Sequence, residues 1–337
     1  MSAQRGGEAA EIKFDHVTKR YGQNPKPAID DLSITIPAGE ICVVIGPSGG
    51  GKTTAMKMIN RLISISEGDI TIDGTSVKSL EKTELRRGMG YVIQQIGLFP
   101  HMTVEDNVGT VPRLLGWDKS RTRERGRELL ELVGLNPDEH GKRYPNELSG
   151  GQRQRVGLAR AMAADPPLML MDEPFGAIDP ITRERLQDDF LRLHREIRKT
   201  VVFVTHDIDE AIKMGDRICI LREGGILAQY DTPEAILSNP GDEFVARFVG
   251  ADRGLKRLAL RRLEEVDLLP AAQAPGSPPE CTPDTTLRDA LSKMLTEGQM
   301  GVIVRADGAE PKGYLSFELV TRLLSERPEP SGDKVAS

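Results

Sequence analysis

The sequence predicts an α/β fold in which helices cover both faces of a largely parallel sheet. Short apolar runs at 41–46, 168–173, 201–207 and 217–223 are separated by helical patterns. Continuous runs of Val, Ile and Leu indicate strands that are buried on both faces, as in parallel sheets. The segment 100–165 has helical patterns without a strand pattern, which predicts a helical subdomain inserted into the sheet domain. A smaller α/β unit is expected near the C-terminus.

Composition and charge restrict the kind of protein further. The 337 residues are 38% hydrophobic and 28% charged, which fits a globular chain with one large and one smaller domain. A net charge of −6 argues against a protein that coats nucleic acid. No stretch of about 18 apolar residues could span a membrane, and residues 1–11 lack the apolar core of a signal peptide. Cys42, Cys219 and Cys281 have no metal-binding spacing, so we expect buried free thiols in a reducing compartment.

A phosphate-binding loop follows the first apolar run. Residues 46–54 read GPSGGGKTT, which matches G-x-x-x-x-G-K-[ST] between a predicted strand and a predicted helix. Glycines let backbone N–H groups turn toward phosphate oxygens, and the helix N-terminus adds the positive end of a dipole. Lys52 would reach the β- and γ-phosphates, and Thr53 would bind Mg²⁺. The expected ATP-binding residues of the loop are Gly46, Pro47, Ser48, Gly49, Gly50, Gly51, Lys52, Thr53 and Thr54.

The second buried run, LMLMDE, ends in two carboxylates. Asp172 would hold Mg²⁺, directly or through water, and Glu173 would polarise a water for attack on the γ-phosphate of ATP. His206, at the end of the third run, could donate a hydrogen bond to that phosphate, and Gln94 could reach both Mg²⁺ and the water. Taken alone, the carboxylates could cap a strand end and the histidine could be structural. The phosphate-binding loop favours the catalytic interpretation.

A second glycine-rich loop, LSGGQ at 148–152, opens another predicted helix. Ser149 is a good N-cap, and the amides of Gly150 and Gly151 make this helix start a second anion-binding site. Such a site could close over the γ-phosphate from the side opposite the first loop. Taken alone, the same residues would form only a capped helix.

These motifs, in this order and spacing, resemble the nucleotide-binding subunit of an ABC transporter over about residues 11–245. LSGGQ is similar to the family signature, and GAID, which ends in Asp179, is similar to its D-loop. Gln94 resembles the Q-loop glutamine, His206 the switch histidine, and Tyr21 the aromatic residue that stacks on adenine. The resemblance implies a P-loop NTPase core of the ABC ATPase type that hydrolyses ATP with Mg²⁺.

The resemblance also implies a homodimer whose two chains face head to tail. Each ATP would lie between the phosphate-binding loop of one chain and the signature of the other, so that ATP joins the dimer and hydrolysis releases it. The signature residues expected to contact the partner's ATP are Leu148, Ser149, Gly150, Gly151 and Gln152.

Within the family, segments 91–108 and 164–183 look like those of osmoprotectant importers for glycine betaine, carnitine and choline. This implies a quaternary-amine-transporting ATPase at the cytoplasmic face of the inner (plasma) membrane. It would work with a membrane permease, docked near Gln94–Val108, and with an extracytoplasmic substrate-binding protein. Four apolar residues of the docking segment could line a groove for a permease helix or belong to the core: Ile96, Leu98, Phe99 and Met102.

The substrate class is open at this point, because such an ATPase does not touch the transported solute. An importer for another small solute, such as an amino acid, fits the same motifs. A soluble ABC ATPase without a transport role is a second alternative, although such chains usually carry two ATPase halves or a long coiled-coil insertion. A regulatory binding module with little turnover is a third, against which the presence of Glu173 and His206 argues.

The expected domains are the ABC ATPase domain at 11–248, a linker at 249–280 and a small unit at 281–326. The small unit resembles a single CBS motif, a module that usually occurs in pairs and can bind adenosine-type ligands. Its last turn has Leu319 where the motif usually has Asp, so a packing or dimer-forming role is an alternative to nucleotide binding. The basic run 253–262 could be a solvated helix face or could contact anionic lipid.

Overall fold

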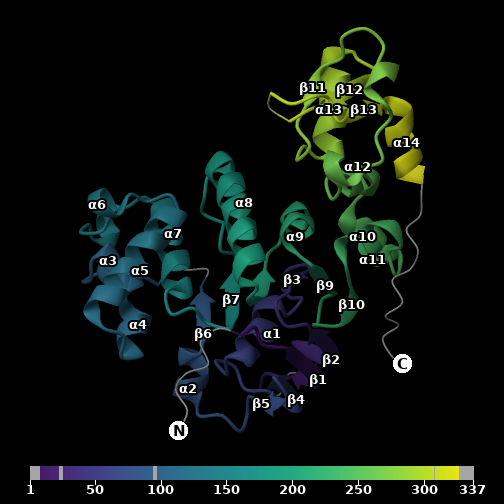
Figure 1. Ribbon diagram of the computed structural model, residues 1–337. Helices are drawn as coiled ribbons and strands as arrows, with labels where there is room; N and C mark the ends of the chain where they lie inside the picture. The colour runs from purple at the N-terminus through teal and green to yellow at the C-terminus, as the bar shows by residue number, and fades with distance from the viewer. Residues whose placement is uncertain (1–7, 23–25, 94–96, 307, 326–337) are drawn as a thin grey trace. The chain divides into compact units, whose positions relative to one another are not determined.

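The computed structural model describes residues 8–22, 26–93, 97–306 and 308–325 of the chain (Figure 1). Gln94 and Ile96, both expected in the permease-contacting segment, therefore lie outside the described residues. The chain forms two compact units. The first combines the chain up to Asp207 with Met214–Tyr230, and the second combines Ile208–Lys213 with the chain from Asp231 onward.

A six-stranded sheet forms the centre of the first unit. Its strands in spatial order are β10 (Leu227–Asp231), β9 (Arg217–Leu221), β3 (Ile41–Ile45), β8 (Thr200–Val204), β7 (Leu168–Asp172) and β6 (Met89–Val92). β3 pairs in parallel with β8 and β9, and β7 pairs in parallel with β6 and β8. Every residue of β3, β7 and β8 is buried, which confirms the strands predicted from the continuous apolar runs.

The register of this sheet brings three loops to one edge. Val204 of β8 lies opposite Val44 of β3 on one side and opposite Asp172 of β7 on the other. Because parallel strands have their carboxyl ends at the same edge, the chain segments that leave β3, β7 and β8 start close together. Those segments are the phosphate-binding loop, the turn at Glu173 and the turn at His206.

A four-stranded antiparallel sheet, which we did not predict, completes the first unit. Its strands in order are β2 (Ile29–Ile36), β1 (Ile12–Lys19), β4 (Glu67–Ile72) and β5 (Thr75–Ser76). One apolar cluster joins this sheet to the parallel sheet and to helix α1 (Lys52–Ile59); Phe14, Val44 and Met56 belong to it. The helix that follows the phosphate-binding loop is therefore anchored in the same core as both sheets. α1 ends at Ile59.

The predicted helical subdomain is present and gathers on one side of the first unit (Figure 1). Its helices are α3 (Val104–Val108), α4 (Thr110–Leu114), α5 (Lys119–Leu132), α6 (Pro137–His140) and α7 (Gly150–Met162). Leu129 and Leu130 of α5 are buried, as are Val133 and Leu135 that follow. Two further helices are α2 (Lys82–Arg87) and α8 (Pro180–Ile197), and α8 follows the turn after β7.

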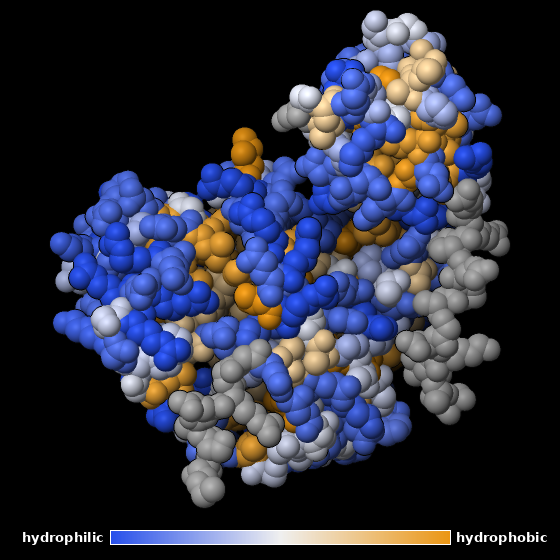
Figure 2. Space-filling model, in the orientation of Figure 1, coloured by the Kyte–Doolittle hydropathy of each residue, from blue (hydrophilic) through white to orange (hydrophobic). Residues whose placement is uncertain are grey.

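The second unit has its own apolar core. Its helices are α9 (Ile208–Met214), α10 (Pro233–Ser238), α11 (Glu243–Val249), α12 (Arg253–Leu258), α13 (Leu287–Glu297) and α14 (Phe317–Ser325). Its sheet has the order β11 (Glu280–Cys281), β12 (Gly301–Val304) and β13 (Gly313–Ser316). The small α/β unit expected near the C-terminus is therefore present, with α13, β12, β13 and α14 following one another along the chain. On the face that Figure 2 shows, hydrophobic residues of this unit reach the surface beside α14.

The stretch expected to be a linker differs from the sequence-based expectation. Leu258 and Leu263 are buried in the core of the second unit. Lys256 is buried too, and its Nζ donates to the Val249 carbonyl oxygen at 2.9 Å and pairs with Asp252 at 3.1 Å. The basic run 253–262 is therefore not a uniformly solvated helix face, because part of it packs inward.

The expectation about the cysteines agrees with the structure. Cys42, Cys219 and Cys281 are free and buried. Among the described residues, no helix is long and apolar enough to cross a membrane.

Candidate active site

The phosphate-binding loop has a backbone that only glycine can adopt at two positions. Gly46 has φ 156°, and a Cβ there would lie 2.2 Å from the Leu221 carbonyl oxygen. Gly51 has φ 79°, and its Cβ would lie 2.3 Å from the Ala28 carbonyl oxygen. Neighbouring backbone atoms therefore fix the shape of the loop between the end of β3 and the start of α1.

Lys52, the first residue of α1, turns back over this loop. Its Nζ donates to the carbonyl oxygens of Gly46 at 2.8 Å and Pro47 at 2.9 Å. Burial lowers the pKa of Lys52, and the carboxylates of Glu173 and Asp172 act in the opposite direction. The ammonium thus lies across the mouth of the loop, close to two acidic groups from another strand.

Thr53 and Asp172 meet although 119 positions separate them in the sequence. The Thr53 hydroxyl donates to Asp172 Oδ1 at 3.1 Å. Asp172 is only 3% exposed, and burial raises the pKa of its carboxyl, while the Thr53 hydrogen bond lowers it. A hydroxyl and a carboxylate oxygen are ligands that Mg²⁺ accepts alongside phosphate oxygens and water. The two residues therefore fit the metal-binding role expected of them; Gln94, the third expected ligand, lies outside the described residues.

Glu173 and His206 also meet, as the parallel pairing of β7 and β8 requires. His206 Nδ1 lies 3.0 Å from Glu173 Oε1, and the histidine side chain is 70% exposed. The backbone N–H of Glu173 donates to the Val204 carbonyl oxygen at 2.9 Å. Glu173 has φ 48°, a left-handed conformation that is unfavourable for a residue with a Cβ. The turn after β7 is therefore strained at the residue expected to act as the base.

A hollow of about 620 Å³ extends from the phosphate-binding loop to Tyr21. The Tyr21 side chain is 48% exposed, and Lys19 Nζ lies 4.9 Å from the centre of its ring. An exposed aromatic ring beside the loop is a suitable surface for a nucleobase to stack on. The sequence did not identify most of the lining, which comprises Tyr21, Lys26, Pro27, Ala28, Asp30, Gly49, Glu223, Gly224 and Ile226.

The signature forms a regular helix start. Ser149 is exposed and caps α7: its hydroxyl accepts from the Gln152 N–H at 3.2 Å, and the Gln152 side chain accepts from the Ser149 N–H at 2.9 Å. Leu148 is buried and anchors this turn. A Cβ added at Gly150 would meet no atom of the described residues within 4 Å, so the first turn of α7 is open to another molecule. Asp179 of the D-loop is the N-cap of α8, and its side chain accepts a hydrogen bond from the Thr182 N–H. This hydrogen bond lowers the pKa of Asp179.

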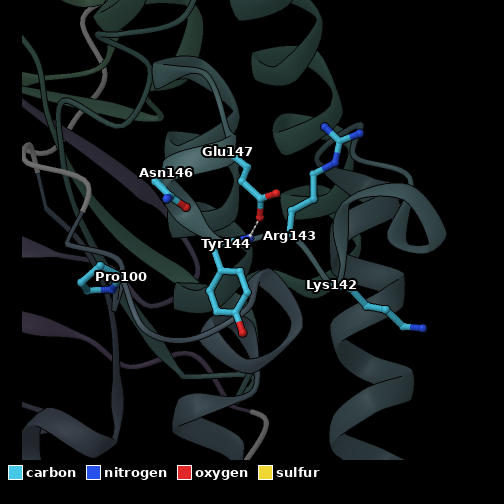
Figure 3. A pocket seen from close by; sticks show the side chains of 6 residues that line it. All are labelled: Pro100, Lys142, Arg143, Tyr144, Asn146 and Glu147. Carbon is cyan, nitrogen blue, oxygen red and sulfur yellow. Dashed lines mark hydrogen bonds between the residues drawn. The ribbon is translucent and has the colours of Figure 1, made fainter.

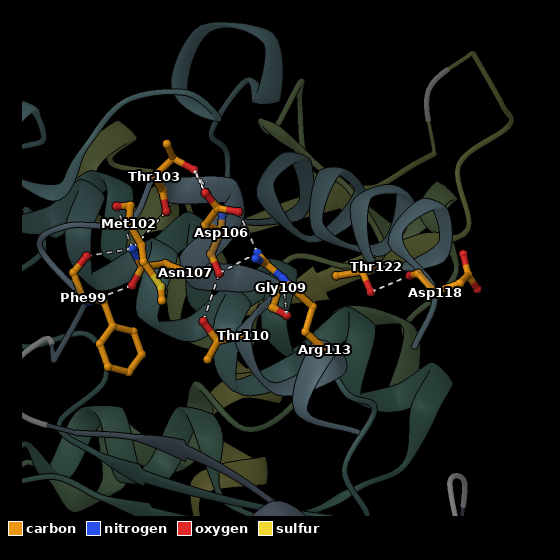
Figure 4. A network of polar contacts seen from close by, with 10 residues as sticks. All are labelled: Phe99, Met102, Thr103, Asp106, Asn107, Gly109, Thr110, Arg113, Asp118 and Thr122. Carbon is orange, nitrogen blue, oxygen red and sulfur yellow. Dashed lines mark hydrogen bonds and ion pairs between the residues drawn. The ribbon is translucent and has the colours of Figure 1, made fainter. Parts of the chain in front are cut away.

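One buried side-chain amide makes hydrogen bonds to the backbone of the segment that is expected to contact the permease. Asn107 is fully buried; its Nδ2 donates to the carbonyl oxygens of Phe99, Met102 and Thr103, and its Oδ1 accepts from the Phe99 N–H at 2.8 Å (Figure 4). Phe99 is 40% exposed, and Leu98 and Met102 are half-buried. These three side chains are therefore not simply core residues.

A second hollow, of about 600 Å³, lies on the same subdomain (Figure 3). Its floor includes the turn before the signature, where Glu147 accepts from the Tyr144 N–H at 2.6 Å. The lining residues are Pro100, Lys142, Arg143, Tyr144, Asn146 and Glu147.

A phosphate-binding loop between β3 and α1, with a carboxylate pair at the end of β7 in the same parallel sheet, defines a P-loop nucleoside triphosphatase. The chain belongs to the ABC transporter family. The family model for the ABC transporter matches residues 29–176. The resemblance inferred from the motifs is thereby confirmed.

Relatives along most of the chain are ATP-binding proteins of osmoprotectant transport. The chain is 48% identical over 308 residues to the osmoprotectant import ATP-binding protein OsmV of Salmonella typhimurium, covering 90% of this chain and 78% of that protein. It is 50% identical over 309 residues to the choline transport ATP-binding protein OpuBA of Bacillus subtilis, covering 92% and 79%. Identity to the glycine betaine uptake system ATP-binding protein YehX of Escherichia coli is 43% over 309 residues, covering 91% and 98%.

Solved structures of an ABC cassette share the fold. The dimeric structure of MJ0796, a bacterial ABC transporter cassette, matches with a TM-score of 0.61 and 36% identity, over 66% of this chain and 98% of that one. A post-hydrolysis state of MJ0796 bound to ADP and Pi matches with a TM-score of 0.61 and 34% identity over the same shares of the two chains.

Proposed function

We propose that this chain is the ATP-hydrolysing subunit that energises import of quaternary ammonium osmoprotectants through a separate membrane permease. The observation that carries the proposal is the identity of 48% and 50% to ATP-binding proteins of osmoprotectant and choline transport, which extends over 90% and 92% of the chain. Such coverage includes parts of the second unit as well as the ATPase motifs. An importer for another small solute is less well supported, because the relatives described above transport quaternary amines or osmoprotectants.

The proposed chemistry is hydrolysis of ATP by in-line attack of water. The phosphates would lie on the loop from Gly46 to Thr54, with the nucleobase against Tyr21. Thr53 and Asp172, together with Gln94, would hold Mg²⁺, which when bound neutralises charge on the phosphate oxygens. Glu173 would accept the proton of the attacking water, and His206 would orient Glu173 and contact the γ-phosphate.

We also propose that two copies of the chain form each ATP site. The open first turn of α7 supports this, because Ser149 and Gly150 present an anion-binding helix start that is free to meet another molecule. The dimeric state of MJ0796 supports it as well. Each ATP would then lie between the phosphate-binding loop of one chain and Leu148–Gln152 of the other.

Mixing two inactive variants tests this arrangement. Lys52→Ala removes a phosphate contact, and Ser149→Arg blocks the signature by bulk and charge. In a mixed dimer, one site collects both changes and the other is intact. Random pairing of equal amounts yields about half mixed dimers with one intact site each, so turnover can reach about a quarter of the unmodified level by site counting. The gain should increase with protein concentration.

The control is the sum of the activities of the two variants assayed separately. Strict additivity, with mixed dimers demonstrated by differently tagged chains, would mean that the loops do not meet across subunits or that both sites must be intact. A tandem fusion of two chains in which one site is changed separates these two explanations. If the fusion is active, the two sites need not both be intact, and additivity in the mixture then means that the loops do not meet across subunits.

The permease is proposed to dock at the segment that ends at Val108, with an extracytoplasmic substrate-binding protein in the same system. The chain would then lie at the cytoplasmic face of the inner membrane. We further propose an ATPase domain up to about residue 248 and a C-terminal unit that serves packing or dimer formation, with nucleotide binding as the alternative role.

Uptake assays test the substrate class. Cells in which Glu173→Gln replaces the chain should lose uptake of radiolabelled choline, glycine betaine or carnitine and keep uptake of radiolabelled amino acids. Loss of amino acid uptake alone would favour the alternative importer. Unchanged uptake of all these solutes, together with ATPase activity stimulated by nucleic acid, would favour a non-transport ABC ATPase.

A further inference from the structure

One buried glutamine of the signature helix contacts the turn that carries Glu173. Gln154 lies on α7, two residues after the signature, and is 4% exposed. Its Nε2 donates to the Glu173 carbonyl oxygen at 2.8 Å, and its Oε1 accepts from the Ala177 N–H at 2.9 Å. The two ends of a single amide therefore hold both ends of the segment from Glu173 to the start of the D-loop.

The backbone at Glu173 needs such support because of its conformation. A residue with a Cβ at φ 48° stays there only where the surroundings hold it. The Glu173 backbone makes further hydrogen bonds: its N–H donates to the Val204 carbonyl oxygen, and its own carbonyl oxygen accepts from the Gly176 N–H at 3.2 Å. The Gln154 bond to that carbonyl is shorter than the Gly176 bond, and it comes from a helix outside the turn and the sheet.

The direction of the Glu173 carboxylate depends on this backbone. A change of φ at Glu173 away from 48° would rotate its carbonyl group and its Cβ together about the N–Cα bond, and so would displace Oε1 from its position 3.0 Å from His206 Nδ1. A general base must lie within hydrogen-bond reach of the water it activates, and small displacements reduce rates strongly. Gln154 therefore acts on the proposed base through the main chain.

The same helix carries the signature at its start. A Cβ added at Gly151 would lie 3.6 Å from the Ala177 carbonyl oxygen, so the first turn of α7 lies against the D-loop of its own chain. α7 is continuous from Gly150 to Met162, so a shift of its first turn also moves Gln154. The signature and the turn at Glu173 are thereby connected within one chain by one side chain.

We propose that Gln154 is a positioning residue for ATP hydrolysis, which sets the orientation of Glu173 according to the position of the signature helix. The inference rests on the proposed role of Glu173. It differs from a purely structural role for a buried, hydrogen-bonded amide, which would affect stability and leave the catalytic step unchanged.

Gln154→Met tests the proposal, because methionine has a similar length and makes neither hydrogen bond. The matched control is Gln187→Met on α8, since Gln187 is also buried and the same amide is removed. We expect kcat of Gln154→Met to fall about 10- to 100-fold, the size expected for a misplaced catalytic group. The KM for ATP should stay within about twofold, because a loss confined to the transition state lowers kcat alone. Counting active sites by binding of a fluorescent ATP analogue corrects for any misfolded fraction.

Two further variants make the result decisive. Gln154→Glu keeps an acceptor for the Ala177 N–H and loses the donor to Glu173, so its kcat should fall as in Gln154→Met; normal kcat would overturn the contact with Glu173. In a Glu173→Gln background, Gln154→Met should cause no further loss of residual turnover, since both changes affect one step. An equal loss of kcat in Gln154→Met and Gln187→Met, or additive losses in the double variant, would overturn the proposal.

The Glu173→Gln chain alone distinguishes this inference from the proposed function. If Glu173→Gln hydrolyses ATP normally, the assignment of the base is wrong, whatever the Gln154 variants do. If Glu173→Gln is inactive and Gln154→Met keeps its kcat, the base stands and only the positioning role fails.

Discussion

Two glycines with the same backbone angle allow the cost of filling the phosphate-binding loop to be measured. Gly51 and Gly116 both have φ 79°. A Cβ at Gly51 would lie 2.3 Å from the Ala28 carbonyl oxygen and 2.6 Å from Ile29 Cδ1, whereas a Cβ at Gly116 would meet nothing within 4 Å. Replacing each by alanine therefore imposes the same strain on φ and adds a steric clash at Gly51 alone.

The expected magnitudes follow from these two contributions. Gly116→Ala should lower the free energy of unfolding by about 1–2 kcal/mol, the cost of a left-handed residue with a Cβ. Gly51→Ala adds overpacking of about 1–3 kcal/mol, which makes a total of about 2–5 kcal/mol. Ile29 is buried as the first residue of β2, and Ala28 precedes it directly, so the loop must move instead. ATP affinity should then fall more than tenfold, which corresponds to about 1.4 kcal/mol.

Urea unfolding followed by far-UV circular dichroism measures the stability of both variants, and calorimetric titration measures ATP binding. Gly116→Ala should bind ATP as the unmodified chain does. Equal destabilisation by the two changes, or normal ATP affinity of Gly51→Ala, would refute the reasoning that neighbouring backbone atoms fix the shape of this loop.

Three other predictions concern the carboxylates and the C-terminal unit. Glu173→Gln should bind ATP normally and lose about 10²- to 10⁴-fold in kcat, because the amide keeps the shape of the side chain but cannot accept a proton. Steady-state ATPase assays measure this loss. Normal turnover of Glu173→Gln, in an assay where Lys52→Ala is inactive, would exclude Glu173 as the base. Asp172→Asn should raise the free energy of unfolding at neutral pH while turnover is lost. Burial raises the pKa of Asp172 in the folded chain, so the folded chain binds the proton more tightly than the unfolded chain. The contribution of Asp172 to the free energy of unfolding therefore becomes less favourable as pH rises from the usual Asp range through the raised pKa. Urea unfolding between about pH 4 and about pH 8 measures this dependence, and a less stable Asp172→Asn chain at neutral pH would contradict it. Deleting residues 270–337 removes β11–β13, α13 and α14 and exposes Leu258 and Leu263. Basal ATPase activity should persist with an altered dependence on salt. An unfolded ATPase domain would instead show that the C-terminal unit is structural.

The parallel sheet and the helical subdomain could be predicted from the sequence because their patterns are long and regular. Strands buried on both faces appear as unbroken apolar runs, and all five residues of each of β3, β7 and β8 are buried. The antiparallel sheet could not be predicted in the same way. β1 pairs with β2 and β4 with register shifts between Phe14 and Lys19, a stretch that includes His16 with φ 50°, so its apolar residues do not alternate regularly.

The residues of the candidate site could be predicted where a chemically suitable residue type stands at the end of a predicted strand or within a motif. Lys52, Asp172 and His206 follow from motifs, and the structure brings Thr53 to Asp172 and Glu173 to His206. Gln154 and Asn107 could not be predicted, because a buried amide and a solvated amide look alike in a sequence. Their roles depend on backbone groups that only the folded chain brings near: Ala177 for Gln154, and the carbonyl of Phe99 for Asn107.

The hydrogen bonds within the chain indicate the order in which an ATP site is assembled. Lys52 bonds to loop carbonyls, Thr53 to Asp172, and Glu173 to His206, so each charged group of the phosphate-binding half already has a partner. Bound phosphates and Mg²⁺ would replace these partners with new ones, so that the buried charged groups would remain paired. The signature differs, since the turn at Ser149 and Gly150 faces open space in its own chain. In the proposed dimer, one chain would therefore bind ATP with its phosphate-binding half alone, and the groups that close over the γ-phosphate would arrive with a second chain. When the signature of a chain contacts the partner's ATP, Gln154 would transmit the shift of the signature helix to Glu173 of that same chain. Closure of one ATP site would therefore orient the proposed base of the other site.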